Sequence, residues 1–138
     1  MNNGKGMTFL ALMIVVAVTG LFLRFAIEQF INWNIAQGEA GAQDTLKLVS
    51  TAIENYAEDH LGMYPLNLSA LCQSEPPYID KAYTQMGVSR GYLLECPVMD
   101  ANGYSCYATP VRCKLTGKNI YRVTTGGSMI LEECTTKE

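Results

Sequence analysis

The sequence predicts an α+β fold in which one long N-terminal helix packs on a small antiparallel β-sheet. Residues 7–23 carry no charged side chain, and apolar residues then continue at helical spacing to about residue 60. After that point, pairs such as Asn102-Gly103 and Gly126-Gly127 separate short segments with the alternating pattern of strands. The helix is therefore expected to be apolar in its first half and amphipathic in its second.

Residues 7–23 are expected to insert into a membrane. At roughly 17 residues the segment is at the short end of the range for a spanning helix, so its length alone also fits a secretory signal peptide. A signal peptide needs small residues at a cleavage site after its apolar core, and residues 21–25 (LFLRF) offer none. We therefore expect the segment to stay attached as an anchor.

The helical pattern continues well beyond the anchor. A helix from residue 7 to about residue 60 would be roughly 80 Å long, far more than the roughly 30 Å hydrocarbon core of a bilayer requires. Gly62 and Pro65 are signals that end a helix. The apolar face of the second half, formed by Leu46, Val49, Ile53 and Tyr56, needs a cover from the rest of the chain.

The cover is expected to be the sheet. Strands are predicted at residues 92–96, 104–111, 120–124 and 129–133, with a helical turn at 66–71, whereas most of residues 78–95 is ambiguous. Tyr121 and Val123 alternate with more polar neighbours, which indicates a sheet with one covered face.

Residues 7–21, MTFLALMIVVAVTGL, resemble the N-terminal segment of type IV pilins and type II secretion pseudopilins, whose mature chains typically begin with a pattern such as FTLIELLIVVAIIGIL. The two align without gaps, with matches or near matches at Thr8, Leu12, Ile14, Val15, Val16, Ala17 and Gly20. The short polar stretch before them ends in Gly6, the residue type that the prepilin peptidase of this family requires before the cut. The later GMYP, residues 62–65, also looks like a G-x-Y-P that often follows this helix in pseudopilins.

This resemblance implies a division of the chain and a function. Residues 1–6 would be a leader peptide, 7–23 the transmembrane and filament-core helix, 24–60 its amphipathic continuation, and 61–138 an exported domain. Cleavage would fall between Gly6 and Met7, and Met7 would then be N-methylated. The protein would be a structural subunit of a pilus or secretion pseudopilus and not an enzyme.

The resemblance also implies partners and a location. The partners would be copies of the chain or other pilin-like subunits, the prepilin peptidase and an inner-membrane assembly platform. The chain would cross the bacterial inner membrane once, with its C-terminal domain outside the cytoplasm, and then enter a periplasmic or extracellular filament. No cofactor is implied, and the slightly acidic composition, with 10 Lys and Arg against 13 Asp and Glu, argues against nucleic-acid binding as the main task.

One position departs from the family pattern. Most members carry Glu at the fifth mature residue, where it is thought to pair with the amino terminus of a neighbouring subunit, and this chain has Ala11 there. An unpaired charge in an apolar bundle is costly, so such a pair would be a strong contact. Ala11 leaves two possibilities open, a minor or tip subunit and a divergent major subunit.

Further positions on the helix have two interpretations each. Arg24 and Glu28, one turn apart, form either an inter-subunit bridge or an ordinary pair at the bilayer edge. Gly38 and Gly41 indicate either a kink or close packing against a neighbour.

The five cysteines all follow the apolar segment and suit an oxidising compartment. Disulfides are expected rather than a zinc site, because no C-x-x-C occurs. Cys106 and Cys113 flank a hairpin end, and the other three could supply one more bridge, but spacing does not fix the pairing. The candidates are Cys72, Cys96, Cys106, Cys113 and Cys134.

The remaining polar groups predict no catalytic site. His60 is the only histidine and is expected at the surface, and Asp100 is expected to serve a turn rather than to bind calcium. Arg112, Lys114, Lys118 and Arg122 are expected to form a solvated charged loop, with DNA, an acidic surface or a neighbouring subunit as alternative partners. A second hypothesis for the whole chain is a single-pass membrane protein whose disulfide-bonded outer domain binds a partner and never polymerises.

Overall fold

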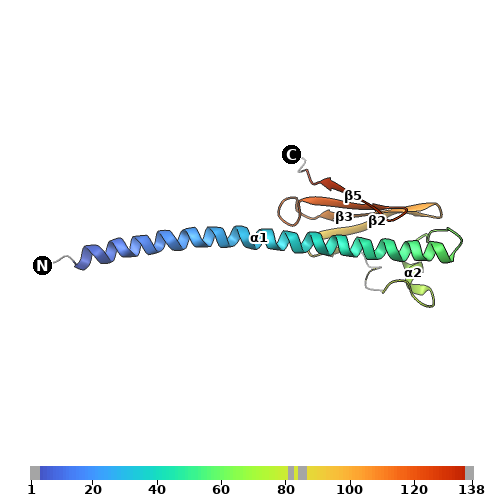
Figure 1. Cartoon of the computed structure of the whole chain (residues 1–138), viewed down its shortest axis with the longest axis horizontal. Helices are drawn as coiled ribbons and strands as arrows, with labels where there is room; N and C mark the ends of the chain where they lie inside the picture. The colour runs from blue at the N-terminus through green and yellow to red at the C-terminus, as the bar shows by residue number, and fades with distance from the viewer. Residues whose placement is uncertain (1–3, 81–82, 84–86, 136–138) are drawn as a thin grey trace. The chain divides into compact units, whose positions relative to one another are not determined.

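The computed structural model describes residues 4–80, 83 and 87–135 (Figure 1). Residues 1–3 of the predicted leader, and residues 81–82 and 84–86 of the ambiguous stretch, lie outside this description. The chain divides into two compact units, residues 1–34 and residues 35–138. The predicted fold class is confirmed: one long N-terminal helix and a small antiparallel sheet.

Helix α1 (Gly4–Asp59) has 56 residues and closes with the signals that the sequence contains. Leu61 and Gly62 both have positive φ, at 58° and 83°. In this conformation the Gly62 N–H reaches back to the Ala57 carbonyl at 2.7 Å, which satisfies a carbonyl that the helix end would leave unpaired.

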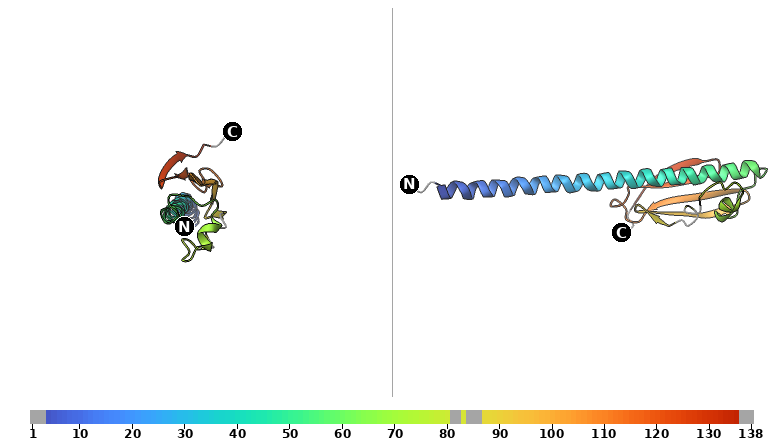
Figure 2. Two further views of the ribbon diagram at one scale, coloured as in Figure 1. Left: turned by 90° about the vertical axis from the view of Figure 1, so that its right-hand side faces the viewer. Right: turned by 90° about the horizontal axis from the view of Figure 1, so that it is seen from below.

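The sheet is a simple antiparallel meander in the order β1-β2-β3-β4-β5. Its strands are β1 (Val88–Ser89), β2 (Tyr92–Asp100), β3 (Gly103–Pro110), β4 (Asn119–Thr124) and β5 (Ser128–Glu133). The predicted turns at Asn102-Gly103 and Gly126-Gly127 join β2 to β3 and β4 to β5. Figures 1 and 2 show these strands alongside the second half of α1.

Two predicted boundaries are wrong. The strand expected at residues 92–96 continues to Asp100, because a shift in register between Glu95 and Val98 accommodates Pro97 within the strand. The helical turn expected at 66–71 is instead α2 (Ser69–Gln73), which starts where the Asn67 side chain accepts a hydrogen bond from the Ala70 N–H at 3.0 Å. Strand β1 was not predicted.

The core lies between the second half of α1 and one face of the sheet. Leu46, Val49 and Ile53 are completely buried, as the need for a cover predicted, and Tyr56 packs at the margin. The sheet contributes alternate residues that are almost fully buried, as period-2 strands require: Tyr92, Leu94, Tyr104, Cys106, Ala108, Tyr121 and Val123.

Candidate assembly helix and the folded unit behind it

The first half of α1 exposes an apolar surface all round. Every side chain described between residues 8 and 34 is exposed. The helix is long and apolar enough to cross a membrane. A surface of this kind is not stable in water and indicates contact with lipid or with other helices. The large apolar residues that form it are Phe9, Leu10, Leu12, Met13, Ile14, Val15, Val16, Val18, Leu21, Phe22, Leu23, Phe25, Ile27, Phe30, Ile31 and Trp33.

Between residues 8 and 23, the few polar or small residues suit an apolar environment. The Thr19 hydroxyl donates to the Val15 and Val16 carbonyls at 2.8 and 3.0 Å, so it needs no partner outside the helix. Ala11 is uncharged, and Gly20 has no other atom within 4 Å of the place of a Cβ. Small residues of this kind let a second helix approach closely.

Arg24 and Glu28 form an ion pair on the helix surface. Their Nε and Oε1 atoms lie 3.7 Å apart, and the side chains are 83% and 63% exposed. An exposed pair at this spacing stabilises a helix by only about 0.3–0.5 kcal/mol. Both groups therefore remain available to exchange this weak contact for one with another chain.

Gly38 packs closely within the folded unit, whereas Gly41 has more room. A Cβ on Gly38 would lie 2.9 Å from the Arg90 carbonyl oxygen and 3.3 Å from that of Thr116. A Cβ on Gly41 would meet only the flexible Arg90 side chain, at 3.4 Å or more. The helix is continuous through both residues, so neither marks a break in α1, and the packing interpretation holds for Gly38 alone.

We expect alanine at these two positions to change stability in opposite directions. Gly38→Ala should destabilise the folded unit by about 1–2 kcal/mol, because the backbone of another segment must move. Gly41→Ala should be neutral or stabilising by up to about 1 kcal/mol, because alanine is the better helix former. Urea unfolding of the full chain in detergent micelles, followed by tyrosine near-UV circular dichroism, measures both. Equal effects of the two substitutions would contradict this packing.

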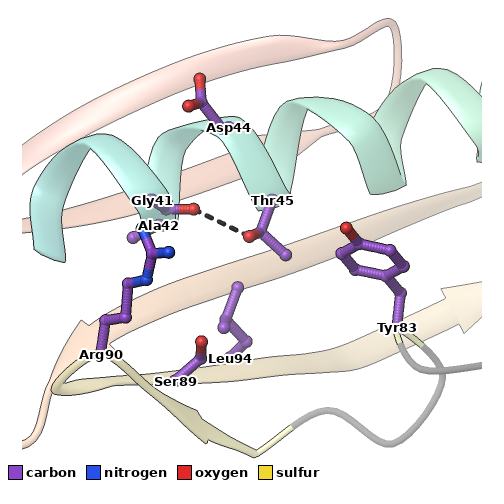
Figure 3. Close-up of a pocket in the computed structure, with 8 residues that line it drawn as sticks. All are labelled: Gly41, Ala42, Asp44, Thr45, Tyr83, Ser89, Arg90 and Leu94. Atoms are coloured by element: carbon purple, nitrogen blue, oxygen red, sulfur yellow. Dashed lines mark hydrogen bonds between the residues drawn. The ribbon is translucent and has the colours of Figure 1, made fainter. Parts of the chain in front are cut away.

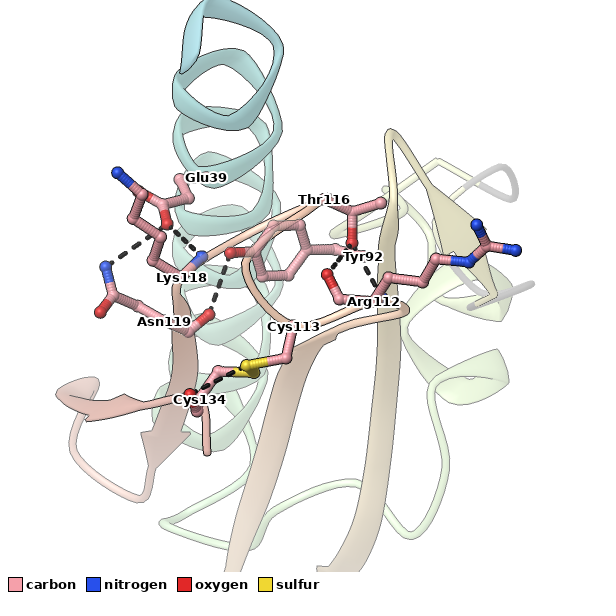
Figure 4. Close-up of a disulfide and its surroundings, with 8 residues drawn as sticks. All are labelled: Glu39, Tyr92, Arg112, Cys113, Thr116, Lys118, Asn119 and Cys134. Atoms are coloured by element: carbon pink, nitrogen blue, oxygen red, sulfur yellow. Dashed lines mark hydrogen bonds between the residues drawn. A yellow bond between two sulfur atoms is a disulfide. The ribbon is translucent and has the colours of Figure 1, made fainter. Parts of the chain in front are cut away.

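The structure resolves the cysteine pairing that the sequence left open. Disulfides join Cys96 to Cys106 and Cys113 to Cys134, and Cys72 is free. Figure 4 shows the Cys113–Cys134 disulfide. Cys106 and Cys113 flank the predicted hairpin end but do not pair with each other: Cys106 pairs with a cysteine of β2, and Cys113 with one that follows β5. The Cys72 thiol donates to the Ile79 carbonyl at 3.2 Å.

The second disulfide closes the chain end onto the loop between β3 and β4. Its sulfurs join residues 21 apart in the sequence, and the Cys134 N–H also donates to the Lys118 carbonyl at 2.9 Å. In the chain-entropy model a cross-link across a loop of this length stabilises by about 3 kcal/mol. This matters for β5, whose six residues are all exposed.

Glu54 joins the helix to the sheet, and sequence reasoning missed it. Its carboxylate accepts hydrogen bonds from the Tyr104 hydroxyl at 2.9 Å, the Tyr64 hydroxyl at 3.1 Å and the Gly126 N–H at 2.7 Å. Burial and the hydrogen bond to Glu54 raise the pKa of Tyr104 well above its usual value of 10. The one signal in the sequence that could have indicated this role was a carboxylate on the face of the amphipathic helix that the sheet covers.

A curated relative matches about half of this chain in sequence. The chain is 33% identical over 70 residues to the competence protein ComGC of Halalkalibacterium halodurans. The matched residues make up 51% of this chain and 68% of ComGC. The chain belongs to the pilin-like family of ComGC. No family model and no solved structure matches it. Membership of this family fits the long apolar helix followed by a folded unit.

One shallow pocket of about 290 Å³ lies between α1 and the β1–β2 turn (Figure 3). Its Thr45 hydroxyl donates to the Gly41 carbonyl at 2.8 Å, and no histidine or cysteine lines it. In the part of the chain that the structure describes, no group of three His, Cys, Asp or Glu residues is placed to hold a metal.

The other predicted polar residues have structural contacts. His60 is exposed and stacks on Tyr56 with 3.8 Å between ring centroids. The Asp100 carboxylate accepts from the Asn102 and Gly103 N–H groups at 2.8 and 3.0 Å, which is the contact of a plain turn. Arg122 does not join Arg112 on the loop, because its guanidinium lies 5.1 Å from the centre of the Tyr107 ring on β3.

Proposed function

We propose that this chain is a structural subunit of a type IV pilus or secretion pseudopilus and polymerises through its N-terminal helix. The observation that carries the proposal is the apolar surface of residues 8–34, which is exposed all round the helix. Helices of this composition associate by close packing of small and apolar side chains, and α1 offers Ala11, Ala17 and Gly20 for that purpose. Membership of the ComGC family supports the same role.

The proposal includes a maturation step. The prepilin peptidase would cleave between Gly6 and Met7 and leave Met7 as an N-methylated first residue. Cleavage there removes Lys5, the charge that precedes the apolar segment. The mature helix would then begin with an uninterrupted apolar run, anchored in the inner membrane with the folded unit outside the cytoplasm, until the assembly platform adds the subunit to a filament.

The mature N-terminus tests this proposal directly. We expect intact mass and N-terminal peptide analysis of the native protein to show a chain that starts at methylated Met7. In cells without prepilin peptidase the chain should begin at Met1. A chain with Met1 in both strains, or a cut after Leu23, would exclude the proposed processing.

Ala11 bears on the kind of subunit. A chain without the family's usual carboxylate lacks one contact to its neighbour's amino terminus, which suits a minor or tip subunit, although a divergent major subunit would also dispense with it. The number of copies per filament in sheared fractions distinguishes the two. The second hypothesis, a single-pass membrane protein with a binding domain, predicts no filament that contains this chain.

A further inference from the structure

Four basic side chains lie on two neighbouring loops of the folded unit. Arg90 is in the turn between β1 and β2, and Arg112, Lys114 and Lys118 are in the loop of residues 111–118 between β3 and β4. All four are exposed, and within the described part of the chain none of their side chains has a hydrogen bond or an ion pair. We call these two loops the basic platform.

The two loops of the basic platform pack as one body. The Val111 N–H donates to the Gly91 carbonyl at 2.9 Å. Gly91 lies so close to Thr116 that a Cβ would be 2.8 Å from that side chain, and the Thr116 hydroxyl accepts from the Arg112 N–H at 3.0 Å. The Cys113–Cys134 disulfide holds the same loop from its other side (Figure 4). The charges are therefore presented on a fixed surface rather than on free loops.

The basic platform is attached to the point where α1 enters the folded unit. The Lys118 N–H donates to the Glu39 carboxylate at 2.8 Å (Figure 4), and the Arg90 carbonyl lies against Gly38. In the sequence, Glu39 follows Trp33 by six residues. Trp is a residue type that is enriched at membrane interfaces. The platform therefore contacts the first residues of the folded unit, which follow the exposed apolar residues 8–34 in the chain.

Two of the basic residues adopt a conformation that is unfavourable for them. Arg90 and Lys114 have φ of 49° and 66°, in the left-handed region where Gly or Asn is normally found. The loop of residues 111–118, which contains Lys114, also carries Val111 and Leu115, whose side chains are 53% and 58% exposed. Basic side chains next to exposed apolar ones are typical of a surface that binds a lipid interface.

We propose that the basic platform binds the anionic phospholipid headgroups of the membrane in which residues 7–23 are anchored, while Leu115 and Val111 enter the interface. This inference rests on the membrane anchoring in the proposed function. Two nearby carboxylates reduce the local positive charge. They belong to Glu39 and to Glu133, which lies opposite Asn119 on the adjacent strand. The attachment should therefore be weaker than the basic charges alone would make it, and it should weaken further with added salt.

Hydrogen exchange in nanodiscs tests the inference. The full chain is placed in discs of phosphatidylcholine, with or without phosphatidylglycerol, and amide exchange is measured by mass spectrometry over residues 111–118. We expect exchange about fivefold slower in the anionic discs, the effect of about one basic residue at a charged surface. The triple variant Arg112→Gln/Lys114→Gln/Lys118→Gln should lose this protection, whereas the control Arg122→Gln should keep it.

The possible outcomes separate this inference from the proposed function. A chain that elutes with the discs but exchanges equally in both lipids overturns the platform's role and leaves the anchoring intact. Protection in neutral discs that grows with the number of chains per disc identifies a second copy as the occupant and also overturns it. Failure to elute with the discs overturns the anchoring and the inference with it.

Discussion

Replacing Gly117 with alanine is expected to destabilise the folded unit by about 3 kcal/mol or more, because the new methyl group has no space. A Cβ at this position would meet three side-chain atoms of Tyr92, which is completely buried. Tyr92 cannot move without breaking the hydrogen bond from its hydroxyl to the Asn119 carbonyl, at 2.9 Å. Urea unfolding in micelles, followed by tyrosine near-UV circular dichroism, measures the loss.

A double-mutant cycle assigns this effect to the contact with Tyr92. Tyr92→Leu removes all the atoms that the Gly117 methyl would meet, so Gly117→Ala should cost less than about 1 kcal/mol in that background. The coupling between the two positions should therefore be large and favourable. Strictly additive losses would mean that Gly117 is required for another reason. One such reason is the close approach of the Cys113 backbone, which forms an isolated β-bridge with Gly117.

The long helix could be predicted from sequence because its signals are local and repeated. The apolar residues of the second half recur on one face, and Leu61 and Gly62 end α1 almost where the pattern stops. The three later strands could be predicted for a similar reason, since their turns contain glycine pairs or Asn-Gly. In these elements propensity, hydrophobic pattern and turn chemistry agree.

The other features depend on distant contacts and left little trace in the sequence. Pro97 normally argues against a strand, and only pairing with β3 shows that a bulge accommodates it. The partners of Cys106 and Cys113 depend on which strands are adjacent. The roles of Gly38 and Gly117 depend on what packs against them, and a glycine in a sequence does not reveal its neighbour. Processing after Gly6 stays a prediction.

Glu54→Ala is expected to destabilise the folded unit by about 3 kcal/mol, because one carboxylate holds three donors from separate segments. The Tyr104 side chain is 3% exposed, so its hydroxyl cannot turn to bulk water when the carboxylate is lost. A buried group left without its partner costs about 1–3 kcal/mol, and hydrogen bonds to charged groups are the stronger ones. The Gly126 N–H would lose its acceptor at the same time, which should raise hydrogen exchange in the turn between β4 and β5.

Two further variants separate the hydrogen bonds from helix effects. Glu54→Gln keeps the length of the side chain and one accepting oxygen, so it should cost about half as much, since its NH₂ group cannot accept from the second tyrosine. Glu58→Ala, at an exposed position on the same helix, should change stability by less than about 0.5 kcal/mol. If Glu54→Ala and Glu58→Ala had equal effects, the carboxylate of Glu54 would not be the link between α1 and the sheet, and packing of Leu46, Val49 and Ile53 alone would hold the two together.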